Sequence, residues 1–292
     1  MLLEIAIGDA YAVAWEFVPE ALYPRHTWDG YQQRPKTSNR KPPDRGAYTD
    51  DTLRSLANAR VLLAEEALDP LSYIREIKRV FREDRRMGWS KNFQAFLEGQ
   101  LEKPDTAWLH EMKGRDTNGA LMGAAVMGLL PTADQAEEAG RIQALVTHDA
   151  VGAEYAAAIS LAAFGMRTGA CRGNDALLYV YDRMPAVVHD IHEVGRVGRV
   201  DMSARTTAAA VFQVLRNRKS LKGIMDEVLA MGGDTDSVAA AAFGMASLAP
   251  DAYDLRLPTW AFRDLEAMAE GPETVSRIRQ TDIALSRLVA HL

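Results

Sequence analysis

The 292-residue sequence has one cysteine, Cys171, no long apolar run and little net charge. A single cysteine excludes an intramolecular disulfide and a thiolate-rich metal site, so a reducing compartment is expected. No apolar run approaches the roughly 20 residues of a membrane-spanning helix, and no basic leader precedes Glu4 and Asp9. These absences predict a cytoplasmic protein that has no membrane partner.

The chain also lacks a basic excess, because 34 Lys and Arg residues stand against 40 Asp and Glu residues, a net charge of -6. This balance argues against non-specific nucleic-acid binding, although a modified base remains open as a substrate. The short basic run at 216–222 is expected to be a solvated helix connection. No repeat, low-complexity tract or linker is present, so residues 1–292 are expected to form a single domain.

Strand-like runs are scarce, and apolar residues recur at intervals of three and four. The pattern predicts an all-α fold in which small residues at 120–128, 156–165 and 239–246 let helices approach closely. The predicted helices span residues 53–68, 71–86, 119–130, 133–146, 150–168, 175–188, 203–217, 221–230, 237–248 and 272–292. Residues 34–47, which contain three prolines, are expected to form a solvated surface loop or, alternatively, a flap beside the site.

Two acidic motifs stand at the starts of predicted helices: Thr49-Asp50-Asp51-Thr52 and Gly233-Asp234-Thr235-Asp236-Ser237. Either motif alone is most simply a helix cap, since Asp, Ser and Thr satisfy free amides there. However, each motif offers two carboxylates and two hydroxyls, which is more than a cap requires. The preceding Gly232 and Gly233 permit the tight turn that would aim both acids inward.

If the motifs converge, four carboxylates share one pocket and need raised pKa values or bound cations. Oxygen ligands without cysteine or a histidine cluster favour two Mg²⁺ or Mn²⁺ ions over zinc. Such a pair, about 3.5–4 Å apart, can orient substrate hydroxyls and activate water.

Six segments in order resemble the ADP-ribosylglycohydrolase family. They are Gly8-Asp9-Ala10 followed by Glu16-Phe17, Tyr48 to Thr52, Thr117 to Met122, Thr147-His148, Gly232 to Ser237, and Leu257 to Trp260. Departures from the family pattern, which include Tyr11 and Trp15 near the opening motif, Gly123 in place of Arg, and Ser237 in place of Thr, bear on substrate choice.

The resemblance implies an all-α orthogonal helical bundle with a binuclear Mg²⁺ or Mn²⁺ centre. The implied reaction releases ADP-ribose from an ADP-ribosylated protein or small-molecule acceptor. The implied metal ligands are Thr49, Asp50, Asp51, Asp234, Asp236 and Ser237. The implied catalytic residues are Glu16, a candidate general base or gate, with Asp50 and Asp236. The implied substrate-binding residues are Gly114, Arg115, Asp116, Thr117, Asn118 and Gly119, in a loop for diphosphate and ribose, and His148.

Other interpretations of these residues remain open. Glu16 would lie two helical turns from Asp9 and could pair with an arginine such as Arg54. His148 could be a hydrogen-bonded structural residue. Trp89, Phe93 and Phe96 are expected to be core packing rather than a pocket wall, and the histidine and acid pairs at 189–190 and 192–193 are expected to lie on the surface.

Two rival functions also remain. The first is an HD-type phosphohydrolase, since His148-Asp149 and His189-Asp190 spell that dipeptide in an all-α chain. It leaves both acidic motifs unexplained. The second is a non-catalytic ADP-ribose-binding relative, which retention of every expected ligand type disfavours. The sequence does not distinguish arginine, serine, a base or a small molecule as the acceptor.

Overall fold

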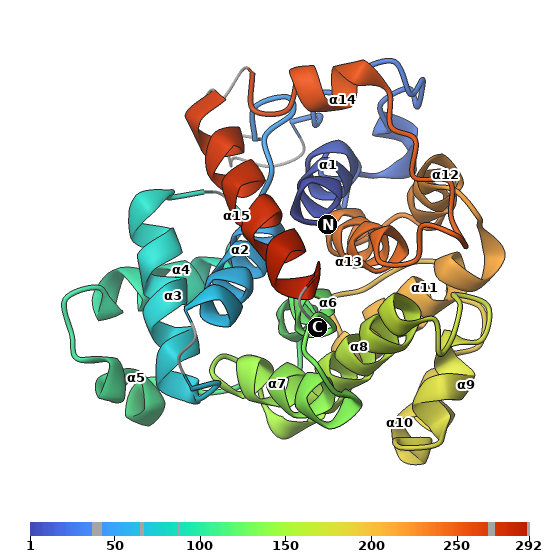
Figure 1. The fold of residues 1–292 in the computed structure, drawn as a ribbon. Helices are drawn as coiled ribbons and strands as arrows, with labels where there is room; N and C mark the ends of the chain where they lie inside the picture. Colours follow the sequence, from blue (N-terminus) through green and yellow to red (C-terminus); the bar gives the residue numbers. More distant parts are fainter. Residues whose placement is uncertain (37–42, 65–66, 87, 268–271, 291–292) are drawn as a thin grey trace.

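The computed structural model describes residues 1–36, 43–64, 67–86, 88–267 and 272–290, and these residues form an all-α fold (Figure 1). Two isolated β-bridges are their only extended pairings. The helices are α1 (Leu2–Ala12), α2 (Asp50–Leu63), α3 (Pro70–Glu83), α4 (Lys91–Gln100), α5 (Asp105–Glu111), α6 (Ala124–Met127), α7 (Ala133–Leu145), α8 (Ala150–Thr168), α9 (Ala176–Tyr181), α10 (Pro185–Val194), α11 (Ala204–Asn217), α12 (Leu221–Met231), α13 (Thr235–Ser247), α14 (Thr259–Arg263) and α15 (Pro272–Ala290).

Helices α1 and α13 lie side by side at the centre, although they come from opposite ends of the chain (Figure 1). Small residues make this approach possible. A Cβ on Gly8 would lie 2.9 Å from the Ala239 carbonyl oxygen, and a Cβ on Gly244 would lie 2.8 Å from Ile5. The close pairing brings Asp9 of α1 beside the first turn of α13.

Most of the predicted helices are present, with boundaries shifted by a few residues. Two predictions were wrong in their continuity. The segment 119–130 is broken, because Gly123 takes a φ of 73° that ends one turn before α6 begins. The segment 175–188 is two helices, since Pro185 begins α10 and cannot continue α9.

Four helices were not predicted: α1, α4, α5 and α14. Nearly all of α1 is buried, so it has no polar face to produce the periodic pattern. Part of the predicted loop at 34–47, residues 37–42, lies outside the described residues.

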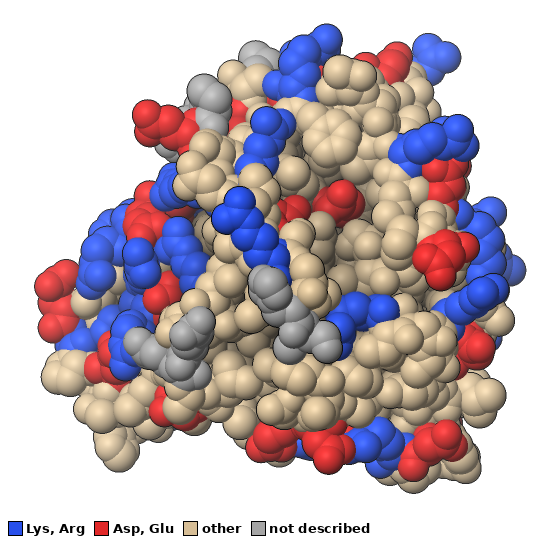
Figure 2. Space-filling model, viewed as in Figure 1, with Lys and Arg blue, Asp and Glu red and all other residues tan. Residues whose placement is uncertain are grey.

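None of the described helices combines the length and apolar character that crossing a bilayer requires. On the face in Figure 2, basic and acidic side chains are interspersed, in keeping with the modest net charge.

Candidate active site

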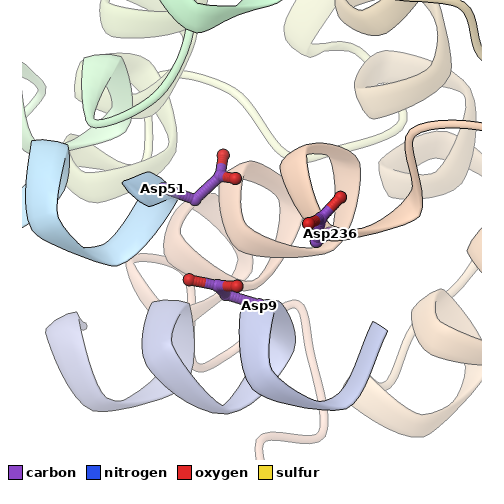
Figure 3. Close-up of side chains that lie close together, drawn as sticks. All are labelled: Asp9, Asp51 and Asp236. Atoms are coloured by element: carbon purple, nitrogen blue, oxygen red, sulfur yellow. The ribbon is translucent and has the colours of Figure 1, made fainter. Parts of the chain in front are cut away.

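Three aspartates from three helices meet at the centre of the fold (Figure 3). Asp9 comes from α1, Asp51 from the first turn of α2, and Asp236 from the first turn of α13. All three are buried, and one carboxylate oxygen from each lies within 4.8 Å of the others. The two acidic motifs therefore converge, and the sequence interpretation missed Asp9 as their third partner.

Asp9 also satisfies the start of α2. Its Oδ2 accepts hydrogen bonds from the backbone N–H of Thr49 at 2.9 Å and of Thr52 at 3.2 Å. Both threonine hydroxyls also donate to Asp9, at 2.9 and 2.6 Å. Because a side chain from another helix caps α2, Asp50 and Asp51 are not needed as its cap.

Burial makes the negative charge of these groups costly. It raises the pKa of Asp9 to about 6, even though four hydrogen bonds from Thr49 and Thr52 act in the opposite direction. Burial, and then repulsion from neighbouring carboxylates, raises the pKa values of Asp50, Asp51 and Asp236 well above their ordinary range. The Oδ1 atom of Asp51 has no hydrogen-bond partner among the described residues. A buried cluster of carboxylates is stable only when some of its members are protonated or when cations are bound.

Two glycines set the turn before Asp234, as the sequence predicted. Gly232 has a φ of 67° and Gly233 a φ of 85°, a region that disfavours side chains. Backbone hydrogen bonds tie this turn to Val200, whose N–H donates to Gly232 and whose carbonyl accepts from Asp234, both at 3.1 Å. The Asp234 side chain makes no capping bond, and its Oδ2 accepts from Asn118 Nδ2 at 2.8 Å.

The remaining predicted ligands surround the three aspartates. The Ser237 hydroxyl lies 3.4 Å from Asp51 Oδ2, and the Thr49 hydroxyl lies 3.5 Å from the same oxygen. Asp50, Asp234 and Ser237 line the adjoining cavity together with Asp51 and Asp236. All six residues predicted as ligands therefore lie at this centre.

The acidic centre opens into a cavity of about 670 Å³, a volume typical of small-molecule sites. One wall is the predicted substrate loop, of which Arg115, Thr117, Asn118 and Gly119 line the cavity. The other two predicted loop residues, Gly114 and Asp116, do not line it. The loop reaches the acidic centre through Asn118, which bonds Asp234.

His148 holds this loop in place. Its Nε2 lies 3.0 Å from the Thr117 hydroxyl and its Nδ1 lies 2.7 Å from the Thr147 hydroxyl. A Cβ on Gly119 would lie only 2.9 Å from Nε2, so a glycine is needed for this contact. Burial, and then the charge of Arg54, lowers the pKa of His148 to about 3, which keeps the ring neutral.

The neutral state of His148 gives a testable dependence of stability on pH. Below about pH 6.5 the unfolded chain binds a proton at His148, whereas the folded chain does not bind it until the pH falls to about 3. As the pH is lowered from 7.5 to 5, the free energy of unfolding of the wild type should therefore fall by about 2 kcal/mol more than that of His148→Gln. The limiting slope is about 1.4 kcal/mol per pH unit. Urea unfolding of both metal-free proteins at each pH measures this. If the free energies of unfolding of the two proteins changed equally with pH, a neutral buried ring would be contradicted.

Glu16 lies beside the acidic centre, but not where a continuous helix would place it. Helix α1 ends at Ala12, and Glu16 lines the cavity from the segment that follows. Arg34 binds it, with Nη1 at 2.5 Å from Oε2 and Nη2 at 2.9 Å from the Glu16 carbonyl oxygen. The suggested partner, Arg54, instead donates to Gln143. Burial raises the pKa of Glu16 to about 7 despite the charge of Arg34.

A model of the ADP-ribosylglycohydrolase family matches residues 1–249. The chain belongs to this family. Among solved structures it is similar to one described as an ADP-ribosylglycohydrolase-related protein complex, with a TM-score of 0.72 and 23% identity over 99% of this chain and 96% of that chain. This likeness supports the shared all-α fold. No curated protein matches the chain. Family membership supports a hydrolase that acts on ADP-ribose linkages.

This family member has an aromatic wall in its cavity, formed by Trp89, Phe93 and Phe96. Core packing was the favoured interpretation of these three side chains, and a pocket wall was the alternative. Phe93 and Phe96 do pack edge-on against the buried Trp108, with ring centroids 6.1 and 4.8 Å apart, but all three also face the cavity. The wall comes from residues 89–96, including the unpredicted helix α4.

The HD-type alternative finds no support in the site. Asp149 caps α8 by accepting from the Gly152 N–H at 3.0 Å. At the end of α10, Asp190 and Glu193 both bind Arg205, at 3.0 and 3.1 Å. Within the part of the chain that the structure describes, the aspartates of α1, α2 and α13 form the one cluster of potential metal-binding acids.

Proposed function

We propose that this chain hydrolyses the glycosidic bond between ADP-ribose and an arginine side chain of a protein, with two Mg²⁺ or Mn²⁺ ions bound. The products would be free ADP-ribose and the unmodified protein. The observation that carries this proposal is the cluster of Asp9, Asp51 and Asp236, two of which line a cavity, in a member of the ADP-ribosylglycohydrolase family.

The residues present fit divalent ions. Three buried carboxylates meet, one of their oxygens lacks a partner, and their pKa values are raised by burial and mutual repulsion. All the donors are oxygens, which suits Mg²⁺ and Mn²⁺. Asp9, Asp51 and Asp236 would hold one ion, and Thr49, Asp50, Asp234 and Ser237 would complete the sites. Bound ions would supply a lowered pKa for water and would orient the ribose hydroxyls.

The chain's own residues would then position the substrate. Thr117, Asn118 and Gly119 line the space that the diphosphate and ribose would occupy, and neutral His148 fixes that part of the loop through Thr117. Glu16 would accept the proton of the attacking water. The bond at the anomeric carbon breaks through an oxocarbenium-like transition state, so the surrounding carboxylates stabilise the positive charge that develops there.

Charge favours arginine as the acceptor. Acids and bases both line the cavity: Glu16, Asp50 and Asp234 would attract the guanidinium end of the substrate, while Lys91, Lys113 and Arg115 would attract its diphosphate. A serine linkage carries no such charge and would lack the attraction to the acids.

The proposal is tested by offering ADP-ribosyl-arginine and ADP-ribosyl-serine peptides to the purified protein and measuring free ADP-ribose. With Mg²⁺ or Mn²⁺ we expect release from the arginine peptide, loss of release with a chelator, and recovery when metal is restored. Release of ADP-ribose from the serine peptide alone would show that the acceptor is serine and not arginine. If neither peptide were cleaved with metal present, the demodification function would be wrong.

A further inference from the structure

A second cavity, of about 420 Å³, lies away from the acidic centre, among α9, α10, α11 and α12. Its apolar lining comes from Leu177, Ile191, Ala209 and Phe212, while arginines and polar side chains complete it. In Figure 2, Lys and Arg side chains gather along the right-hand edge, beside α11 and α12. The proposed glycohydrolase reaction leaves this cavity without a role.

The charges around the second cavity are not balanced. Its only acidic lining residue, Glu227, already accepts hydrogen bonds from Asn217 at 2.8 Å, Arg218 at 2.6 Å and Gln213 at 3.3 Å. Arg196 and Arg216 also line the cavity, and neither makes an ion pair with a described residue. Two exposed guanidinium groups that are free of ion pairs with described residues therefore border this space.

Two acids of α10, the helix that supplies Ile191 and His192 to the cavity, are already paired. On α10, Asp190 and Glu193 lie 3.0 and 3.1 Å from Arg205 Nη2, so they are engaged with that cation. His192, on the same helix, lines the cavity and adds a further hydrogen-bonding ring. The surroundings thus favour an anion from outside the chain.

We propose that this cavity binds a small organic phosphate that carries a flat apolar group. Guanidinium groups match phosphate oxygens in geometry, and a phosphate monoester carries about -1.5 to -2 charge at pH 7, which two free arginines neutralise. The apolar group would lie against Phe212 and Leu177, and the volume is in the range of small-ligand sites.

One short segment connects the second cavity to the acidic centre. Residues 195–202 begin at Gly195 and Arg196, which line the second cavity, and end at Met202, which lines the first. Between them, Val200 bonds the backbone of Asp234, and the Met202 carbonyl accepts from the Asn118 N–H at 2.8 Å. A phosphate held by Arg196 would therefore bias the segment that positions Asp234 and Asn118.

Calorimetric titration of the metal-free protein with phenyl phosphate tests the binding, and loss of the arginines of the second cavity separates this site from the first cavity, whose lining also includes Lys91, Lys113 and Arg115. We expect saturable binding at the second cavity, with inorganic phosphate binding more weakly because it lacks the apolar group. The double variant Arg196→Ala/Arg216→Ala should weaken phenyl phosphate binding at least tenfold. The matched control is Arg256→Ala, since Arg256 is exposed and pairs only with Asp254.

Thermal melts of all three proteins check that the variants fold. No saturable binding, or equal binding by the double variant, would overturn the site. Coupling to the acidic centre rests on the proposed function and is measured separately. Saturating phenyl phosphate should change ADP-ribose release by the metal-loaded wild type but not by the double variant. If phenyl phosphate bound but did not change ADP-ribose release, the coupling would be wrong and the binding site would stand.

Discussion

Replacing Asp51 with asparagine is expected to lower kcat/KM for ADP-ribose release by about 10²–10³-fold, the size of effect seen when a group that stabilises the transition state is lost. Asp51 is the member of the cluster with an unpartnered buried oxygen, and it lies against both Asp236 and the Ser237 hydroxyl. Asparagine keeps the shape of the side chain but removes the charge that would hold a cation. Steady-state assays on the ADP-ribosyl-arginine peptide measure the loss.

The same substitution should not destabilise the metal-free protein. Burial and the neighbouring aspartates raise the pKa of Asp51, so the folded state gains nothing from its charge. A thermal melt should show an unchanged or higher Tm. Asp134→Asn is the control, since that carboxylate lies on the surface and pairs with Arg183. Full activity in Asp51→Asn would refute a catalytic cluster, and a lower Tm would mean that the carboxylate serves the fold.

Replacing Gly233 with alanine is expected to lower the free energy of unfolding by about 3 kcal/mol or more. Gly233 has a φ of 85°, and a Cβ at this position would overlap the Val200 carbonyl oxygen. The turn would have to open, which would break the hydrogen bonds between Val200 and the residues on either side of Gly233. Because this turn aims Asp234, the folded fraction should also lose metal affinity.

Chemical unfolding measures the loss of stability, and Gly30→Ala is the matched control. Gly30 has no left-handed backbone conformation and no atom within 4 Å of the added Cβ, so its stability should change by less than about 0.5 kcal/mol. If Gly233→Ala were as stable as the control, the turn would not be a constraint on the site.

Much of the site could be predicted from the sequence, because its residues cluster in short motifs. The two acidic motifs, the glycine pair and the loop before Met122 each have a local signature that survives without knowledge of the fold. Whether they converge depended on the family resemblance, since sequence spacing says nothing about distance. The structure supplies the contact between Asp51 and the motif at Ser237.

Asp9 and the pairing of Glu16 were harder to predict for physical reasons. Asp9 lies in a helix that is buried nearly all round, so neither amphipathic contrast nor a second acid marked it as part of the centre. The partner of Glu16 depended on where α1 ends. The helix ends at Ala12, and in the segment that follows Glu16 binds Arg34.

The helix breaks show a similar limit. Apolar periodicity continues through Gly123 and across the junction before Pro185, so the pattern predicted unbroken helices there. The helices are interrupted because Gly123 has a positive φ and because Pro185 lacks the N–H that would continue the preceding helix.

The most direct test of the metal centre is a calorimetric titration of the metal-free protein with Mn²⁺, performed on the wild type and on Asp234→Asn/Asp236→Asn. We expect two bound ions per wild-type chain and no measurable binding to the double variant, whose helical circular dichroism should be unchanged. Equal Mn²⁺ affinity in the two proteins would contradict it.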